Sequence, residues 1–275
     1  MKPFAKIDIR CATEDDLPQM MYIWRTVFGD SDAYIRFFFE ERHALSDALL
    51  LTVQGEVISQ LFLLPAQVRC GMQSFSVFYL FAAATLPSYR GCGYMGELIR
   101  AAQQKCRSQG IDGIVLLPAE DSLYDYYERF DFETAFSRKV WHGARAQLLA
   151  LCEPAALDSE NAEAFLWRNQ QRTDGIAWSK FALQYALREQ AKFRGAYTVA
   201  DGCAFAAVDD VCTVLSSPER FSKGVYALLS LTTDDVLSLV LPPDAPIGTE
   251  EKGGMLWSAS RKISLEKAFL TFPMQ

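Results

Sequence analysis

A glycine-rich turn that begins with an arginine is the segment whose residues could most directly bind a charged ligand. The turn consists of Arg90, Gly91, Cys92, Gly93, Tyr94, Met95 and Gly96. It lies between a strand-like run rich in Phe, Tyr and Val at 76–85 and a helix-like segment at 97–109. The first N–H groups of a helix lack partners within the helix, and the helix dipole is positive there, so an anion is stabilised. Because glycine lets a ligand come close to the backbone, the turn predicts a diphosphate site.

The same glycines also spell a dinucleotide-binding pattern. Residues 91–96 read G-x-G-x-x-G, and Glu120 follows at roughly the distance expected of a ribose-binding acid. In that motif the strand leads almost directly into the first glycine, whereas residues 87–90 intervene here. No series of strand–helix units precedes the turn. A dinucleotide-dependent enzyme, which would bind NAD, therefore stays as an alternative.

Apolar periodicity predicts the elements that must position this turn. Helices are expected at 17–28 and 33–42, and strands at 49–53, 57–68, 74–86 and 111–117. The first three of these strands form an antiparallel meander that passes into a strand–helix–strand–helix series ending near residue 132. The result is an α/β (α+β) fold, a mixed, mostly antiparallel sheet flanked by helices. Composition favours a packing role for Phe37, Phe38 and Phe39.

The pattern changes from about residue 143. Helices are expected at 144–151 and 161–171, and short strands at 197–200, 204–208, 211–215 and 236–241. We predict two domains, at 1–143 and 144–275, and the second is a smaller α/β domain. It contains no glycine-led phosphate loop, so a second site of that kind is not expected there.

With its leading arginine, the turn resembles the acetyl-CoA pyrophosphate loop of the GNAT N-acetyltransferase superfamily. That loop has Arg or Gln, two residues, Gly, one residue, then Gly or Ala. Arg90 and Gly93 match it, and Met95 stands at the last position, as in the enhanced-intracellular-survival-type acetyltransferases. Within the superfamily, the turn resembles most closely that of these enhanced-intracellular-survival-type enzymes, which have two domains.

Two further segments resemble the same superfamily. Residues 123–132 resemble its aromatic-Tyr-Glu-Lys/Arg-Leu-Gly-Phe helix end, with Asp131 at the glycine position. Aspartate tolerates a left-handed backbone better than most residues, so the turn can persist. The start of the chain resembles the first strand and capped first helix, with Thr13 and Asp16 at capping-box spacing.

The resemblance implies acetyl-CoA as co-substrate and assigns roles at the site. The turn at 90–96 would hold the diphosphate, and Arg90 would help to fix the loop or the phosphates. Backbone groups of Ala83, Ala84 and Thr85 would pair with the pantetheine arm as an added strand. Tyr127 aligns with the tyrosine that donates a proton to the departing thiolate. The base is open among a water-mediated route, Glu120 and the C-terminal carboxylate of Gln275. The second half resembles a degenerate acetyltransferase half.

Bulk composition restricts the class of partner. The chain has 275 residues and a net charge of −7, which argues against general nucleic-acid binding and suits a cationic substrate. Seven scattered cysteines and two isolated histidines indicate neither a disulfide framework nor a metal site. No apolar run is long enough to span a membrane, and the start of the chain has no apolar signal region, so a cytoplasmic location is expected.

These observations together predict an N-acetyltransferase. It would transfer acetyl from acetyl-CoA to a primary amine of a small molecule or peptide by direct attack, with no metal, and it could form a homo-oligomer. Residues 78–82 contain no carboxylate, although many superfamily members have a glutamate on this strand. That departure motivates a second alternative, an acyl-CoA-binding protein with little or no turnover.

Overall fold

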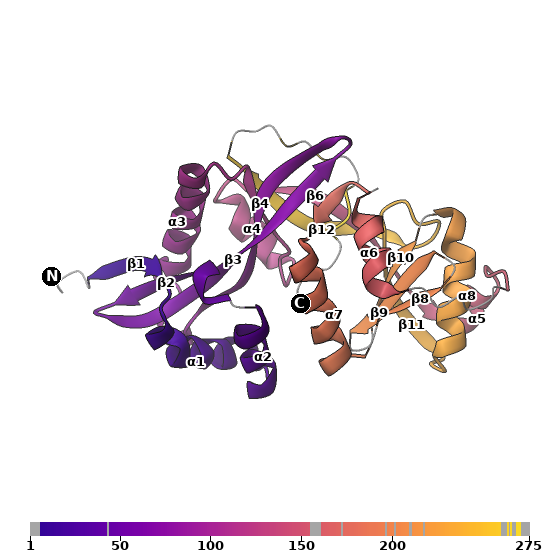
Figure 1. Cartoon of the computed structure of the whole chain (residues 1–275), viewed down its shortest axis with the longest axis horizontal. Helices are drawn as coiled ribbons and strands as arrows, with labels where there is room; N and C mark the ends of the chain where they lie inside the picture. The colour runs from indigo at the N-terminus through magenta and orange to yellow at the C-terminus, as the bar shows by residue number, and fades with distance from the viewer. Residues whose placement is uncertain are drawn as a thin grey trace. The chain divides into compact units, whose positions relative to one another are not determined.

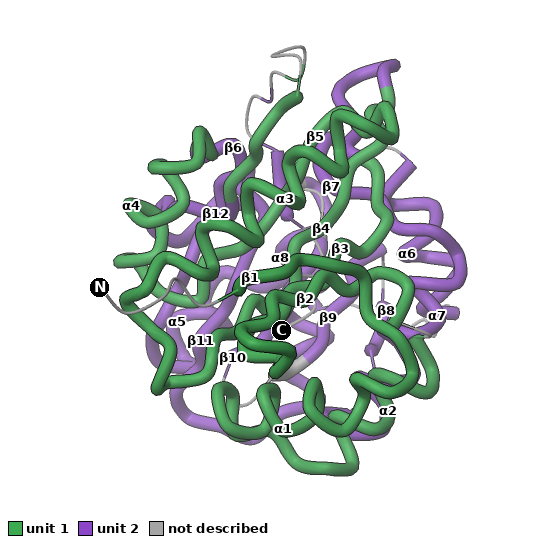
Figure 2. The backbone as a smooth tube through the Cα atoms, turned by 90° about the vertical axis from the view of Figure 1, so that its left-hand side faces the viewer, with its two compact units in different colours: residues 1–67, 74–133, 255–263 green, residues 68–73, 134–254, 264–275 purple. Residues whose placement is uncertain are grey.

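The chain folds into two compact units whose segments alternate along the sequence (Figure 2). Unit 1 comprises residues 1–67, 74–133 and 255–263, and unit 2 comprises 68–73, 134–254 and 264–275. The computed structural model describes residues 6–42, 44–154, 161–171, 173–195, 197–200, 202–208, 211–216, 218–259, 263, 265 and 268–270. Each unit is a sheet with helices packed on it.

The sheet of unit 1 is built from five strands, of which the third and fourth extend by a few residues into unit 2, and from half of a sixth. In spatial order they are β1 (Ile7–Cys11), β2 (Ala48–Val53), β3 (Glu56–Cys70), β4 (Gln73–Thr85), β5 (Gly113–Leu116) and the second half of β12 (Thr249–Ser258). The pairs β1–β2, β2–β3 and β5–β12 are antiparallel, whereas β4–β5 is parallel. The prediction of a mixed, mostly antiparallel sheet flanked by helices is therefore confirmed.

Helices cover both faces of this sheet. Figure 1 shows α1 (Leu17–Phe28) and α2 (Asp32–Arg42) on one side and α3 (Tyr94–Gln109) on the other. On the first side, the Trp24 ring lies 4.8 Å from Phe38 and 5.8 Å from Phe62 of β3. On the second side, apolar residues of α3 and of α4 (Ser122–Glu128) pack with Phe78 and Leu80 of β4. Residues 37–39 are all buried, so their predicted packing role is confirmed.

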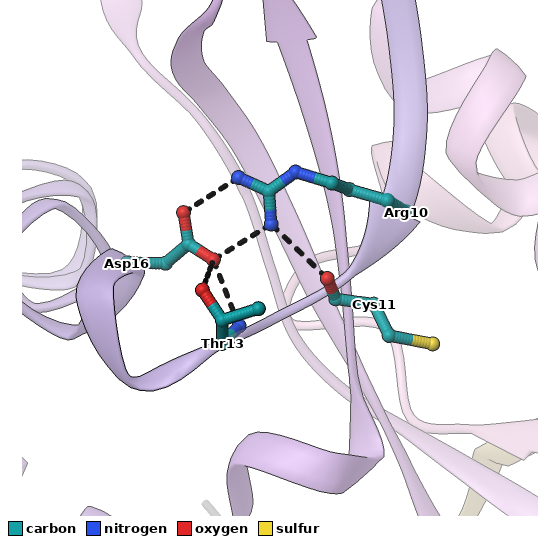
Figure 3. Close-up of polar contacts among 4 residues, drawn as sticks. All are labelled: Arg10, Cys11, Thr13 and Asp16. Atoms are coloured by element: carbon teal, nitrogen blue, oxygen red, sulfur yellow. Dashed lines mark hydrogen bonds and ion pairs between the residues drawn. The ribbon is translucent and has the colours of Figure 1, made fainter.

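A buried carboxylate joins the first strand to the first helix (Figure 3). Both guanidinium Nη atoms of Arg10 donate to the carboxylate of Asp16 at 2.7 Å, and the Thr13 backbone N–H and hydroxyl donate to it at 2.8 Å. The hydrogen bond from Arg10 holds the pKa of Asp16 well below its usual range, although burial opposes the shift. The predicted capping-box spacing of Thr13 and Asp16 is confirmed. The η1 turn (Glu14–Asp16) leads from this box into α1.

The sheet of unit 2 continues from the first half of β12. The next strands are β6 (Glu133–Ala144), β11 (Val236–Leu241), β10 (Val211–Ser216), β9 (Cys203–Val208) and β8 (Thr198–Ala200). The helices are α5 (Arg145–Leu149), α6 (Ala162–Gln170), α7 (Lys180–Phe193) and α8 (Phe221–Leu231). The remaining short elements are β7 (Gly175–Ala177), η2 (Ala44–Asp47) of unit 1, η3 (Pro87–Tyr89) of unit 1 and η4 (Pro218–Arg220). Apolar side chains of α8 and of the strands β9–β11 form the larger core cluster of this unit.

Several elements match their predicted ranges closely, and others were not predicted. α1 spans the predicted residues 17–28, and β11 spans the predicted residues 236–241. α5 is shorter than the helix expected at 144–151, and the sequence did not predict β6, α7, α8 or β12. The functional division at residue 143 stays a prediction, because a compact unit need not coincide with a functional domain. Within the described residues, none of the helices is long and apolar enough to cross a membrane.

Candidate active site

The ladder between β4 and β5 ends midway along β4, and the strand edge beyond it is the opening that defines the candidate site. Their parallel ladder has three pairs and ends at Tyr79 and Val115. β5 itself ends at Leu116, whereas β4 continues to Thr85. Within the described chain, the ladder with β5 therefore leaves residues 80–85 unpaired along that edge. An open strand edge can accept an extended ligand as an added strand.

A bulge at Ala82 lies within this unpaired stretch of β4. Ala82 has φ of 46°, a left-handed conformation that is uncommon for a residue with a Cβ. Leu80 and Ala83 both pack with the cluster under α3, whereas Phe81 contacts Trp24 on the opposite face. Regular alternation would place residues 80 and 82, not 80 and 83, on one face, so Ala82 is an extra residue in the strand. Nothing in the sequence around Ala82 signals this bulge.

The hydrogen bonds of β4 show which backbone groups face the open edge. The Ser59 hydroxyl donates to the carbonyl oxygen of Ala84 at 2.9 Å, and the Leu86 N–H donates to that of Ile58 at 3.0 Å. Backbone groups of alternate residues point to the same side of a strand. Ala84 therefore faces β3, and its neighbours Ala83 and Thr85 face the open edge.

The glycine-rich turn lies directly beyond that edge. Gly91 and Gly93 have φ of 77° and 82°, which glycine adopts without strain. Gly93 is the N-cap of α3, and no side chain caps the first helical turn, so the N–H groups of residues 94–96 are available to a ligand. The Arg90 Nε donates to the Thr85 carbonyl at 3.2 Å and so fixes the turn against the end of β4. Residues 90–93 are exposed.

Gly96 allows α3 to pack closely against the segment that follows α4. A Cβ on Gly96 would lie 3.0 Å from the Phe130 ring, so the missing side chain lets α3 approach the end of α4. The buried Gln103 amide donates to the Phe130 carbonyl at 2.7 Å and joins the same two elements. Asp131 follows with φ of 61°, which confirms the left-handed turn predicted at this position. The helix that ends here carries Tyr127.

Tyr127 is buried on the α3 and α4 side of the sheet. Its side chain is 8% exposed and belongs to the same cluster as Phe78 and Leu80 of β4. Its ring lies 5.7 Å from Phe132 and 5.4 Å from Tyr126, both in edge contacts. Burial, reinforced by Tyr126, raises the pKa of Tyr127 well above its usual value. The phenol therefore stays protonated at physiological pH.

The other candidate acids and bases are exposed or lie outside the described residues. Glu120 and Asp121 are exposed, and the Glu120 carboxylate accepts a hydrogen bond from the Ser122 hydroxyl at 2.8 Å. Gln275 lies outside the described residues. Among the residues that the structure describes, no three His, Cys, Asp or Glu side chains gather as metal ligands do. The structure thus brings together residues 83–85, the turn at 90–96 and Tyr127, all within unit 1.

The comparison with known families decides the identity of this region. Residues 8–135 match the family model described as the acetyltransferase (GNAT) domain. They form a GNAT acetyltransferase domain. The match includes the open edge of β4, the glycine-rich turn and Tyr127, and it confirms the superfamily and the acyltransferase class predicted from the sequence. A search of curated protein sequences found no match.

Solved structures similar to the whole chain share its fold. A GCN5-related N-acetyltransferase from Kribbella flavida aligns with a TM-score of 0.70 and 17% identity, over 92% of this chain and 72% of that one. A probable N-acyltransferase from Enterococcus faecalis V583 aligns with a TM-score of 0.73 and 12% identity, over 93% of this chain and 73% of that one. Eis1 from Mycobacterium abscessus aligns with a TM-score of 0.66 and 16% identity, over 92% of this chain and 74% of that one. The predicted likeness to the enhanced-intracellular-survival type is therefore confirmed at the level of the fold.

Between the strand and the glycines, the GNAT domain differs from a dinucleotide site. The η3 turn occupies residues 87–89, and the Tyr89 N–H donates to the Leu86 carbonyl at 2.9 Å. The first glycine is thus separated from β4 by a short helix and Arg90, whereas a dinucleotide fingerprint starts almost at the strand end. This geometry does not favour the NAD alternative.

Proposed function

We propose that the chain is an N-acetyltransferase that transfers the acetyl group of acetyl-CoA to a primary amine of a small molecule or peptide. The observation that carries this proposal is the open edge of β4, which ends at the uncapped start of α3. A linear ligand with a diphosphate at one end and amide groups along its length matches both features. None of the seven cysteines, all within the described residues, forms a disulfide, which suits a reducing compartment, and we include a cytoplasmic location in the proposal.

The donor binds along the backbone in this proposal. The N–H groups of the first turn of α3 hold the diphosphate, helped by the positive end of the helix dipole. Ala83 and Thr85 offer their backbone groups to the amides of the pantetheine arm, in the manner of an added strand. Arg90 positions the turn through its hydrogen bond to the Thr85 carbonyl. The thioester then lies beside the bulge at Ala82.

Transfer requires one new bond, one broken bond and one proton for the leaving group. The neutral amine attacks the thioester carbonyl, a C–N bond forms, and the C–S bond breaks when the tetrahedral intermediate collapses. Tyr127 donates its phenolic proton to the departing thiolate. Burial raises the pKa of Tyr127, and the same apolar surroundings raise the proton affinity of the thiolate, so donor and acceptor of the proton stay matched.

Calorimetric titration with acetyl-CoA and with NAD tests the donor site. We expect one acetyl-CoA per chain, no NAD binding, and at least tenfold weaker acetyl-CoA binding to Arg90→Glu. Lys223→Glu, on the exposed surface of α8 in unit 2, is the matched control for the charge change and should bind normally. Loss of affinity in both variants would remove the specific role of Arg90, and NAD binding by the wild type would overturn the proposal.

Release of free CoA thiol in the presence of a panel of primary amines tests turnover. We expect Tyr127→Phe to lower kcat by about 100-fold, the lower range for a lost general acid, while the Kd for acetyl-CoA stays unchanged. Tyr126→Phe, the half-buried neighbour on α4, should retain most of the activity. Acetyl-CoA binding by a wild type that acetylates no amine would instead support the alternative of a binding protein.

A further inference from the structure

The proposed donor site accounts for the diphosphate and the pantetheine arm of acetyl-CoA, but for neither its adenosine nor its 3′-phosphate. The pantetheine arm takes the open edge of β4 and the diphosphate takes the start of α3, so the nucleotide end extends beyond the turn, away from β4. The inner face of α3 is closed to it, because Leu98 and Ile99 are fully buried in the core cluster of unit 1. The nucleotide end therefore lies along the exposed side of α3.

Arg100 is the first basic residue of α3, and it lies on this exposed side. Its side chain is 59% exposed, and its Nη1 donates to the Glu97 carboxylate at 2.9 Å. The same Nη1 atom lies 3.6 Å from the position that a Cβ on Gly96 would occupy. Side chains of a helix point back toward its N-terminus, so the guanidinium reaches the first turn, where the diphosphate is proposed to bind.

Two aromatic rings hold this guanidinium close to the first turn of α3. The Cζ atom of Arg100 lies 5.3 Å from the centroid of the Phe130 ring, which is a cation–π distance. The Tyr126 ring meets the Phe130 ring in an edge contact, with centroids also 5.3 Å apart. Phe130 is only 9% exposed, so the ring that supports the guanidinium is fixed in the core. A guanidinium held in this way loses less side-chain freedom when it binds an anion.

Arg129 adds a second positive charge to the same cluster. It follows Glu128, the last residue of α4, and it is exposed. Burial raises the pKa of Tyr126, and the charges of Arg129 and Arg100 oppose that shift, so both arginines lie near this ring. Positive charge thus gathers beside the start of α3, although the chain as a whole has a net charge of −7.

We propose that Arg100 binds the 3′-phosphate of acetyl-CoA and makes the protein select CoA thioesters over acyl donors that lack this phosphate. This inference rests on the proposed function. A phosphate monoester carries close to two negative charges near pH 7 and has three acceptor oxygens. The hydrogen bond to Glu97 comes from Nη1, and Nε and Nη2 can donate two parallel hydrogen bonds to the phosphate.

Acetyl-CoA and acetyl-3′-dephospho-CoA are the two probes, because they differ only in the 3′-phosphate. Calorimetry with the full chain gives the Kd of each probe for the wild type and for Arg100→Gln. Arg107→Gln is the matched control, since it removes the same charge from an exposed arginine in the last turn of α3. The ratio of the two Kd values is the readout, because a general disturbance of the turn weakens both probes equally and leaves the ratio unchanged.

We expect the wild type to bind acetyl-CoA about tenfold more tightly than acetyl-3′-dephospho-CoA, as for a lost hydrogen bond to a charged group. The net charge of −7 by itself favours the less negative probe, so this preference requires a local contact. Arg100→Gln should lower the ratio to about threefold or less by weakening acetyl-CoA alone. Arg107→Gln should keep the ratio of the wild type.

Three results would overturn this inference alone. They are equal affinities of the wild type for the two probes, a ratio that Arg100→Gln leaves unchanged, and a ratio that Arg107→Gln lowers as much as Arg100→Gln does. Failure of the wild type to bind either probe would overturn the proposed function as well.

Discussion

Two strand–helix–strand segments of the molecule have the same order of elements and differ at the start of the long helix. In unit 1, β4, η3 and α3 lead to β5, and in unit 2, β10, η4 and α8 lead to β11. Each segment has a three-residue parallel ladder, and each short helix begins with a proline. Both segments therefore connect two parallel strands through a short 3₁₀ helix followed by a long α-helix.

The difference lies where the long helix begins. Four residues, 90–93, separate η3 from α3, and the N-cap Gly93 is left-handed with φ of 82°. In unit 2, η4 leads directly into α8, whose N-cap Arg220 is right-handed and whose first residue, Phe221, is buried. A helix start can hold an anion only when its N–H groups reach the ligand. The comparison shows how one inserted glycine turn distinguishes a candidate diphosphate site from a closed helix start.

The largest expected effect comes from forcing a side chain onto that turn. A β-branched residue is strained at φ of 82°, so Gly93→Val should shift the backbone of the turn and weaken acetyl-CoA binding at least 100-fold. Gly202→Val in unit 2, with φ of 74° and no atom within 3.5 Å of a new Cβ, is the matched control. It should carry similar strain and leave the Kd for acetyl-CoA within twofold. Calorimetry of both variants is the measurement, and equal losses of affinity would remove the distinction between the two segments.

Both helices also contain a glycine that packs against another element, and here unit 2 is the more sensitive. A Cβ on Gly224 of α8 would lie 2.3 Å from the Cβ of Cys203, whereas a Cβ on Gly96 of α3 would lie 3.0 Å from the edge of the Phe130 ring. Overpacking a core typically costs 1–3 kcal/mol. We expect Gly224→Ala to lower the free energy of unfolding by about 3 kcal/mol and Gly96→Ala by about 1 kcal/mol. Urea denaturation measures both, and a larger loss for Gly96→Ala would reverse this ranking.

The sequence predicted the local parts of this comparison well. The glycine-rich turn, the absence of such a turn in the second half and the left-handed Asp131 follow from residue types with strong backbone preferences. Helix α1 has a clear apolar period, and its boundaries were predicted. These features depend on neighbours in the sequence, so a local pattern contains the information.

The features that open the site were harder to predict. Ala82 is left-handed without a glycine or asparagine to signal it, and the position of Tyr79 at the end of the β4–β5 ladder depends on where that ladder stops. The strand β12 pairs with β5 although about 140 residues separate Leu116 from Met255. Such pairings depend on tertiary packing, which local periodicity does not encode. The sequence therefore predicted the ligand loop better than the opening that leads to it.

A charged cap in unit 1 and a neutral cap in unit 2 predict different responses to acid. Asp16 accepts two hydrogen bonds from Arg10, and its folded pKa is lowered, so its stabilisation is complete above the unfolded pKa near 3.9 and is lost as the pH falls below it. Asp16→Asn should lower the free energy of unfolding by about 1.5 kcal/mol at pH 7. The loss should shrink below about pH 4, where the wild type forfeits the same interaction.

The neutral cap of α6 provides the control for that pH dependence. The Asn161 side chain accepts a hydrogen bond from the Ala164 N–H at 2.9 Å, and it does not titrate. Asn161→Ala should lower the free energy of unfolding by about 1 kcal/mol at every pH at which the chain stays folded. Urea denaturation between pH 3.5 and 7 follows both variants. A pH-independent loss in Asp16→Asn would show that the ion pair with Arg10 is not the source of its stabilisation.

The smallest expected effect concerns one negative charge in the first turn of α3, compared with one just before α8. Glu97 pairs with Arg100 at 2.9 Å on the exposed surface of α3, where such a pair contributes little to stability. Its negative charge lies close to the proposed diphosphate site, so Glu97→Gln should tighten acetyl-CoA binding about twofold at low ionic strength, and about 0.5 M salt should abolish the difference. Glu219→Gln removes the same charge just before α8 and should leave the affinity unchanged. If both variants tightened binding equally, the net charge of −7 rather than the start of α3 would govern the encounter with the anionic ligand.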